Sequence, residues 1–178
     1  AWEIVDVSLS ANRQTFYIHS TEAGAGERHL YSMPVSGGAR TRLTTAVGSH
    51  EVAVSPDGSV FASVYSAGNK PPEVYLGPAS NDLAQRVTTS PSPEWLAGKW
   101  LDPRIVMVQA RDGVKVPARL YRPEEVGAKV NPKHPAVIFV HGAGYLQNAH
   151  RYWSSYFREY MFHHVLASQG YVVIDIDY

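Results

Sequence analysis

A glycine turn that follows an apolar strand is the part of this sequence best suited to chemistry. The apolar run at residues 135–140 leads directly into His141-Gly-Ala-Gly144. Such a turn can point backbone N–H groups at an oxygen atom, and donors fixed in this way stabilise the charge that develops in acyl transfer. The motif predicts part of an oxyanion-binding site; the alternative is a tight strand exit whose glycines only permit curvature. Tyr145 and Gln147 either line the same cleft or are ordinary loop residues.

The nucleophile for such a site is not found in the sequence. A serine on a Gly-x-Ser-x-Gly elbow comes later in the chain than the oxyanion turn. No Gly-x-Ser-x-Gly occurs in these 178 residues. We therefore expect the chain to be a piece of an enzyme that carries part of the active-site frame without the reacting groups.

The amino-acid composition excludes several other kinds of reactive group and partner. The chain has no cysteine, which excludes disulfides and thiolate nucleophiles. Its 16 basic and 16 acidic residues balance, so we expect no nucleic acid and no membrane surface as a partner. No apolar run approaches the roughly 20 residues needed to cross a bilayer. A soluble protein is expected, and the cytoplasm and the periplasm both stay open as compartments.

Neither a metal ion nor a cofactor is expected. His163 and His164 would point about 100° apart on a helix, and no acidic partner recurs at a ligand spacing. The turn Gly142-Ala-Gly144 lacks the third glycine of a dinucleotide-binding fingerprint. Asp175 and Asp177 alternate with isoleucines near a strand end, where we expect them to bond to neighbouring loops instead of forming a glycosidase pair.

Two strands and a helix must position the turn. Residues 135–141 and 171–178 carry continuous apolar runs, which suit a sheet buried on both faces. Residues 151–169 have helical spacing, and Gly170 follows as a C′ glycine. The apolar stripe of this helix consists of Phe157, Tyr160, Met161 and Val165. Strand, helix and strand form a parallel crossover, which places the turn at the carboxyl end of its strand, where open α/β sheets bind ligands.

An internal repeat organises the first half of the chain. Tyr31-Ser-Met-Pro34 is echoed by Tyr75-Leu-Gly-Pro78, and Arg42-Leu-Thr-Thr45 by Arg86-Val-Thr-Thr89, each 44 residues later. A period of this length in a β-rich sequence is typical of propeller blades. Each copy divides into four strands, at residues 3–10, 14–21, 29–34 and 41–46, and then 51–55, 60–66, 73–76 and 85–89. A β-sandwich is the alternative, although sandwiches rarely repeat residues at a fixed offset.

Prolines and turn residues mark the remaining organisation. Pro71 and Pro72 predict a loop outside any central strand, because proline cannot donate to a ladder. The pattern changes at Pro91-Ser-Pro93, so we place partial blades at residues 1–92 and a second domain at residues 93–178. Within the second domain, the turn Arg111-Asp-Gly113 between alternating strands at residues 104–110 and 114–123 predicts a hairpin.

These motifs together resemble one family. Blade-like repeats, Asp112-Gly113 with Leu120-Tyr121-x-Pro123, His141-Gly-Ala-Gly144, and Ala167-Ser-Gln-Gly170 leading into Asp175-Ile-Asp-Tyr178 are similar to the prolyl oligopeptidase family of serine peptidases, above all its dipeptidyl peptidase IV branch. The resemblance covers essentially the whole chain. It implies β-propeller blades followed by the first part of an α/β-hydrolase domain. It also implies an enzyme whose propeller admits short peptides to a Ser-Asp-His site.

The resemblance implies roles for the glycine turn. In the dipeptidyl peptidase IV branch a tyrosine at the strand end donates its hydroxyl to the oxyanion, and the glycine register places His141 at that position. Other members have His-Gly-Gly there, and a backbone N–H serves instead, here that of Gly142 or Ala143. All three triad residues are expected after Tyr178. The chain therefore holds no catalytic residue and is expected to be inactive alone.

Three functions compete. The first is a fragment of a serine exopeptidase or oligopeptidase with a peptide substrate. The second is a fragment of another α/β-hydrolase esterase, because ester and amide cleavage share the acyl-transfer machinery. The third is a non-catalytic binding module built on propeller blades. Two blades cannot close a ring, and open strand edges invite association, so the remainder of the catalytic domain or another chain is expected to be needed for stability.

Overall fold

The computed structural model describes residues 2–142 and 146–177. These residues form two compact units. The first unit comprises Ala1–Ser92 with Arg151–Trp153, and the second comprises Pro93–His150 with Ser154–Tyr178. Within the described residues, no helix is long and apolar enough to cross a membrane.

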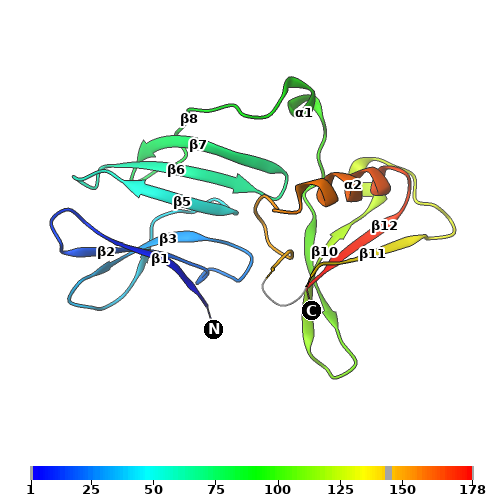
Figure 1. Cartoon of the computed structure of the whole chain (residues 1–178), viewed down its shortest axis with the longest axis horizontal. Coiled ribbons are helices and arrows are strands. Elements are labelled where there is room, and N and C mark those ends of the chain that lie inside the picture. The colour runs from blue at the N-terminus through cyan, green and yellow to red at the C-terminus, as the bar shows by residue number, and fades with distance from the viewer. Residues whose placement is uncertain (1, 143–145, 178) are drawn as a thin grey trace. The chain divides into compact units, whose positions relative to one another are not determined.

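The first unit consists of two antiparallel four-stranded sheets in which each strand pairs with the next (Figure 1). The strands of the first sheet are β1 (Ile4–Leu9), β2 (Thr15–Ser20), β3 (His29–Pro34) and β4 (Thr41–Arg42). Those of the second are β5 (Ser49–Val54), β6 (Val60–Ala67), β7 (Lys70–Pro78) and β8 (Gln85–Arg86). The predicted four strands in each copy are confirmed, and the region is β-propeller-like.

The sequence repeat is also a repeat of hydrogen bonds. The hydroxyl of Thr44 accepts a bond from the backbone N–H of Leu30 at 3.1 Å, and that of Thr88 accepts one from Val74 at 2.9 Å. These are the same positions 44 residues apart. In both copies the fourth strand is only two residues long, shorter than predicted, and a threonine side chain bonds the third strand just beyond it.

The prediction for Pro71 and Pro72 is wrong, because both lie within β7. The register between β6 and β7 shifts between Tyr65 and Ala67, which marks a bulge opposite this part of β7. The register of β7 with β8 covers only Tyr75 and Leu76. The prolines therefore lie beside a bulge and away from that pairing, where a strand tolerates residues that lack an N–H.

The second unit has a four-stranded mixed sheet in the order β11-β12-β10-β9. The strands are β9 (Arg104–Gln109), β10 (Lys115–Tyr121), β11 (Ala136–Val140) and β12 (Val172–Ile176), with α1 (Pro93–Ala97), the 3₁₀ helix η1 (Pro123–Val126) and α2 (Phe157–Ser168). The predicted hairpin is confirmed as antiparallel β9 and β10, and Gly113 at its turn has a φ of 86°. The predicted parallel pair is confirmed as β11 and β12.

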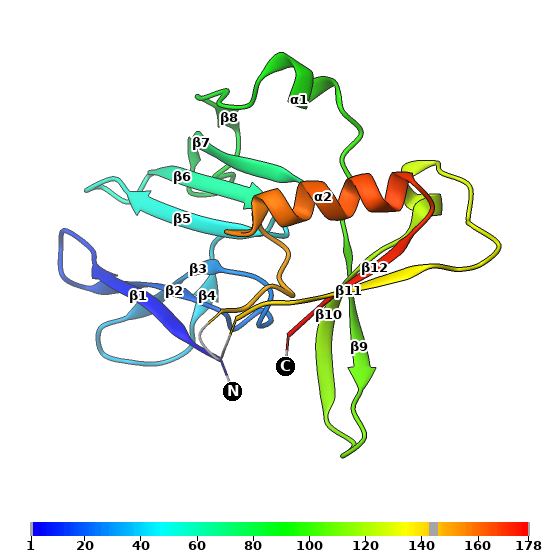
Figure 2. The same cartoon turned by 45° about the vertical axis from the view of Figure 1, so that its right-hand side comes forward.

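Helix α2 differs from the prediction in its start and in its buried face. It begins at Phe157 instead of residue 151, and it contacts β10 and β12 (Figure 2). Its buried side chains are Tyr160, His163 and Ala167. Phe157 and Val165 of the predicted stripe are exposed. The prediction for Gly170 is confirmed, since this glycine follows the helix with a φ of 91°.

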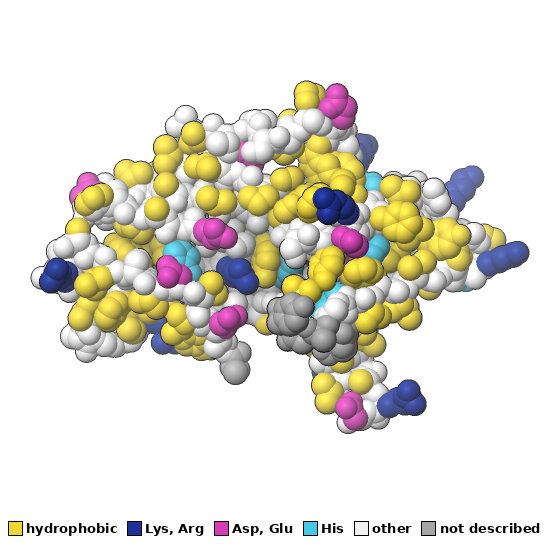
Figure 3. Space-filling model, in the orientation of Figure 1, with side chains coloured by type: hydrophobic (Ala, Val, Ile, Leu, Met, Phe, Trp, Pro, Cys, Tyr) yellow, Lys and Arg dark blue, Asp and Glu magenta, His cyan; other side chains and the backbone are white. Residues whose placement is uncertain are grey.

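The expectation that the sheet is buried on both faces is wrong for the described chain. Val137 and Phe139 of β11 are half-buried, but Ile138 and Val140 are 67% and 57% exposed. Exposed apolar side chains also occur on α2, and Figure 3 shows hydrophobic surface over that helix. Apolar composition predicted β11 as a strand, but it did not show which of its two faces is covered in these residues.

Candidate functional site

The glycine turn begins where two parallel strands end side by side. Val140 of β11 and Ile176 of β12 form the last register pair. His141 and Asp177 each come one residue later, so the register brings them together. The imidazole Nε2 of His141 lies 3.0 Å from Asp177 Oδ1. The His141 side chain is almost fully buried, with 2% of its surface exposed.

Asp177 also holds the chain that returns after the turn. Its Oδ1 accepts a hydrogen bond from the backbone N–H of Asn148 at 2.8 Å, and its Oδ2 accepts one from Ala149 at 3.0 Å. These bonds confirm the interpretation that the aspartates at the strand end bond to a neighbouring loop. A single carboxylate therefore ties the start of the turn to the segment that follows it.

Both ring nitrogens of His141 face hydrogen-bond acceptors. Nδ1 lies 2.8 Å from the carbonyl oxygen of Gly142, and Nε2 faces the Asp177 carboxylate. A carbonyl and an ionised carboxylate accept but do not donate. The His141 ring therefore bridges its own turn and Asp177, and these contacts orient the peptide group of Gly142.

A second buried carboxylate reinforces the loop. Asp175 is 1% exposed, and its Oδ2 accepts a hydrogen bond from the side-chain amide of Asn148. The amide oxygen of Asn148 accepts a bond from the Ser154 hydroxyl at 2.8 Å. Burial raises the pKa of Asp175 to about 6, although the Asn148 hydrogen bond and the Arg119 charge both oppose the increase. Asn148 thus links Asp175 of β12 and Asp177, just beyond that strand, to the loop.

Arg119 and His163 complete the buried polar layer of the second unit. Arg119 is the register partner of Asp175 across β10 and β12, and its guanidinium donates to the His150 carbonyl at 2.9 and 2.7 Å. The His163 ring lies edge-on to Tyr121, with 5.1 Å between the centroids. Burial lowers the pKa of His163 to about 4. Among the described residues, no group of three or more His, Asp or Glu side chains is arranged to hold a metal ion.

The structure brings together some of the predicted site residues. His141 and Gly142 lie in the hydrogen-bonded corner, whereas Gln147 is exposed and precedes the buried Asn148. Ala143 and Tyr145 are outside the described residues. Sequence reasoning missed Asn148, whose role depends on loop geometry. The i, i+2 spacing of the two aspartates was the signal that pointed to this loop.

The chain is similar to known proteins in part of its sequence and in its fold. Residues 1–72 match the family model of the dipeptidyl peptidase IV N-terminal region. The fold is similar to the crystal structure of Porphyromonas gingivalis dipeptidyl peptidase 4, with a TM-score of 0.75 over 99% of this chain and 19% sequence identity. The chain spans 24% of the length of that protein. The predicted resemblance to the dipeptidyl peptidase IV branch is confirmed in sequence for residues 1–72 and in fold for nearly the whole chain.

Proposed function

We propose that this dipeptidyl peptidase IV-like chain is part of a serine peptidase that hydrolyses short peptides by acyl transfer. In this proposal residues 1–92 are propeller blades, and residues 93–178 are the first part of an α/β-hydrolase domain. The triad comes from the remainder of the enzyme. The observation that carries the proposal is the hydrogen-bonded corner of His141, Gly142 and Asp177 at the carboxyl end of a parallel strand.

The corner contributes positioning to the reaction. Attack on a peptide carbonyl places negative charge on its oxygen, and backbone N–H groups held in advance stabilise that charge without reorganising. Asp177 and His141 hold the backbone on both sides of the turn, and neither needs to exchange a proton with the substrate. The backbone N–H groups of Gly142 and Ala143 are the proposed donors. The acyl-enzyme, its formation and its hydrolysis belong to the serine, aspartate and histidine outside this chain.

Activity of the full-length protein tests the proposal. We expect that protein to cleave a Gly-Pro or Ala-Pro chromogenic amide and to lose this activity after treatment with a serine-directed phosphonate. The 178-residue chain alone should cleave neither substrate. Cleavage of esters but not of amides by the full-length protein would instead support an esterase. Cleavage of the amide by the pure chain would show that the nucleophile lies within these residues.

A further inference from the structure

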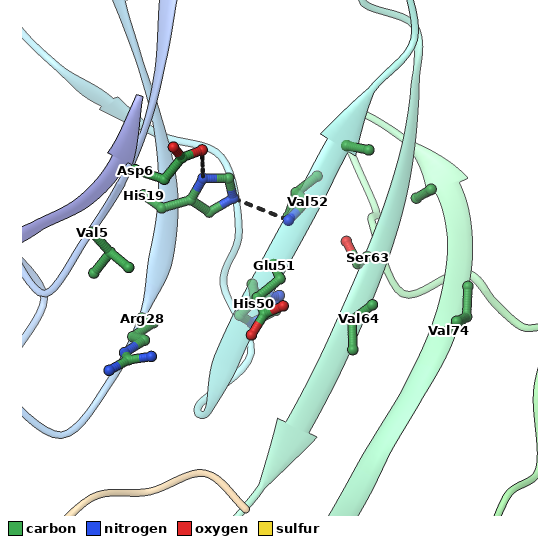
Figure 4. Close-up of a pocket in the computed structure, with 12 residues that line it drawn as sticks. Val5, Asp6, His19, Arg28, His50, Glu51, Val52, Ser63, Val64 and Val74 are labelled. Carbon is green, nitrogen blue, oxygen red and sulfur yellow. Dashed lines mark hydrogen bonds and ion pairs between the residues drawn. The ribbon is translucent and has the colours of Figure 1, made fainter. Parts of the chain in front are cut away.

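A pocket in the first unit combines an apolar wall with charged groups. Its volume is about 570 Å³, which is within the usual range for small-molecule sites. β1, β2 and Arg28 form one side, and β5, β6 and β7 form the other (Figure 4). The apolar lining consists of Val5, Val52, Ala53, Ala62, Val64 and Val74. This lining suits an apolar side chain of a ligand.

Arg28 supplies a donor group to the pocket. Its Nε is buried and has no hydrogen-bond acceptor among the described residues. No ion pair within the described residues joins its guanidinium to a carboxylate, and its Cζ lies over the ring of Tyr152, 5.1 Å from the centroid. A guanidinium donates to a carboxylate through two parallel bonds, and a buried donor left unsatisfied is destabilising. The arrangement favours a ligand that brings a carboxylate.

Two carboxylates of the same pocket, those of Asp6 and Glu51, favour a ligand that also carries a positive charge. Asp6 Oδ2 is 3.8 Å from His19 Nδ1, which is too long for a hydrogen bond. His19 Nε2 accepts a bond from the Val52 N–H at 3.0 Å, and burial lowers the pKa of His19, so this ring is a weak partner for the exposed Asp6 carboxylate. Glu51 is exposed and lies across the space from Arg28 in Figure 4. Around the pocket, Figure 3 shows acidic, basic and histidine side chains gathered over the two sheets.

We propose that this pocket binds a short zwitterionic peptide with apolar side chains. Its carboxylate is received by Arg28, its ammonium group by Glu51 and Asp6, and its side chains by the valines of β5, β6 and β7. A simple anion leaves the two carboxylates unmatched, and a simple cation leaves Arg28 unmatched. The inference goes beyond the proposed hydrolysis and does not depend on it, because binding here requires no triad.

The test is a binding titration of the full-length protein after treatment with a serine-directed phosphonate. The probe is the dipeptide Val-Val, compared by calorimetry with its C-terminal amide and its N-acetyl derivative. We expect Val-Val to bind and each cap to weaken binding by about tenfold or more, because each removes a charge-assisted contact. Arg28→Gln should weaken Val-Val to the same extent, and amidation should then cause little further loss. Arg111→Gln, at an exposed hairpin turn, is the matched control and should bind like the wild type.

Several results would overturn the proposal. These are absence of Val-Val binding at millimolar concentration, equal binding of all three ligands, or full binding by a folded Arg28→Gln protein. If Arg28→Gln does not fold, Glu51→Gln decides: it should weaken Val-Val and reduce the effect of N-acetylation, because only Asp6 then faces the ammonium group. If the phosphonate does not react, the peptidase proposal is contradicted but the pocket proposal is not, because the dependence of Val-Val binding on Arg28 can still be measured.

Discussion

His141 and Asp177 are hydrogen-bonded across the ends of two neighbouring parallel strands, with 3.0 Å between Nε2 and Oδ1. Each residue follows the last register pair of β11 and β12. The same carboxylate accepts the backbone N–H groups of Asn148 and Ala149. The glycine turn therefore has its entrance and its return segment anchored to one side chain.

Replacing Asp177 by asparagine should loosen this corner. Asparagine keeps the shape but removes the charge and one acceptor, so charge-assisted bonds are lost and the free energy of unfolding should fall by about 2 kcal/mol. Turnover by the full-length protein should fall by about tenfold or more. Denaturant unfolding and kcat provide the measurements. Asp112→Asn, at the exposed hairpin turn, should change neither; a wild-type kcat in Asp177→Asn would contradict the positioning role.

His141→Ala distinguishes a positioning imidazole from one that donates directly to the oxyanion. Both ring nitrogens already face acceptors, Gly142 O and Asp177 Oδ1. We therefore expect kcat of the full-length protein to fall by less than about tenfold, with KM nearly unchanged, because backbone donors remain. A loss near a hundredfold in kcat would assign the imidazole to the oxyanion itself.

Asp175 should make the protein less stable as pH rises through about 6. Its folded pKa is raised to about 6 from an ordinary value of 3.8, so the folded state binds the proton more tightly than the unfolded state. The stability from this proton is fully present below about pH 3.8 and is lost as pH rises through 6. The loss is of the order of 3 kcal/mol. Asp175→Asn should remove this contribution, as measured by unfolding at pH 4, 5, 6 and 7.

His163 should act in the opposite direction over the same pH range. Its folded pKa is lowered to about 4 from 6.5, so its contribution is present above pH 6.5 and is lost as pH falls toward 4. His163→Phe keeps an aromatic ring against Tyr121 and removes the titration. In the Asp175→Asn background the opposing contribution of Asp175 is absent. There, His163→Phe should reduce the remaining loss of folding stability as pH falls. An unchanged pH profile in the double variant would rule out His163 as its source.

The two repeat threonines should make similar contributions to stability. Thr44→Val and Thr88→Val each remove the acceptor of a β3 or β7 N–H while keeping the side-chain shape. Each change should lower the free energy of unfolding by about 1–2 kcal/mol, because the N–H loses its partner. Each threonine also has a second side-chain partner, His29 Nδ1 for Thr44 and Glu73 for Thr88, so the two changes should cost similar amounts. Thr45→Val, at an exposed neighbouring position, is the control and should be nearly neutral.

Local patterns in the sequence determined the elements of this protein and their order. The 44-residue repeat predicted two four-stranded sheets, Asp112-Gly113 predicted the hairpin, and Gly170 predicted the end of α2. These features depend on residues close together in the chain, such as a glycine that adopts positive φ or a strand that alternates with its neighbour. The local sequence was therefore sufficient to predict these elements.

Tertiary structure alone decided which side chains meet. The register of β11 with β12 placed His141 against Asp177, 36 residues away, and the bulge between β6 and β7 admitted two prolines that the sequence placed in a loop. The buried face of α2 carries His163 instead of the predicted Phe157 and Val165. Strand register and helix rotation depend on packing between distant segments, and a one-residue change in either sends different side chains into the core.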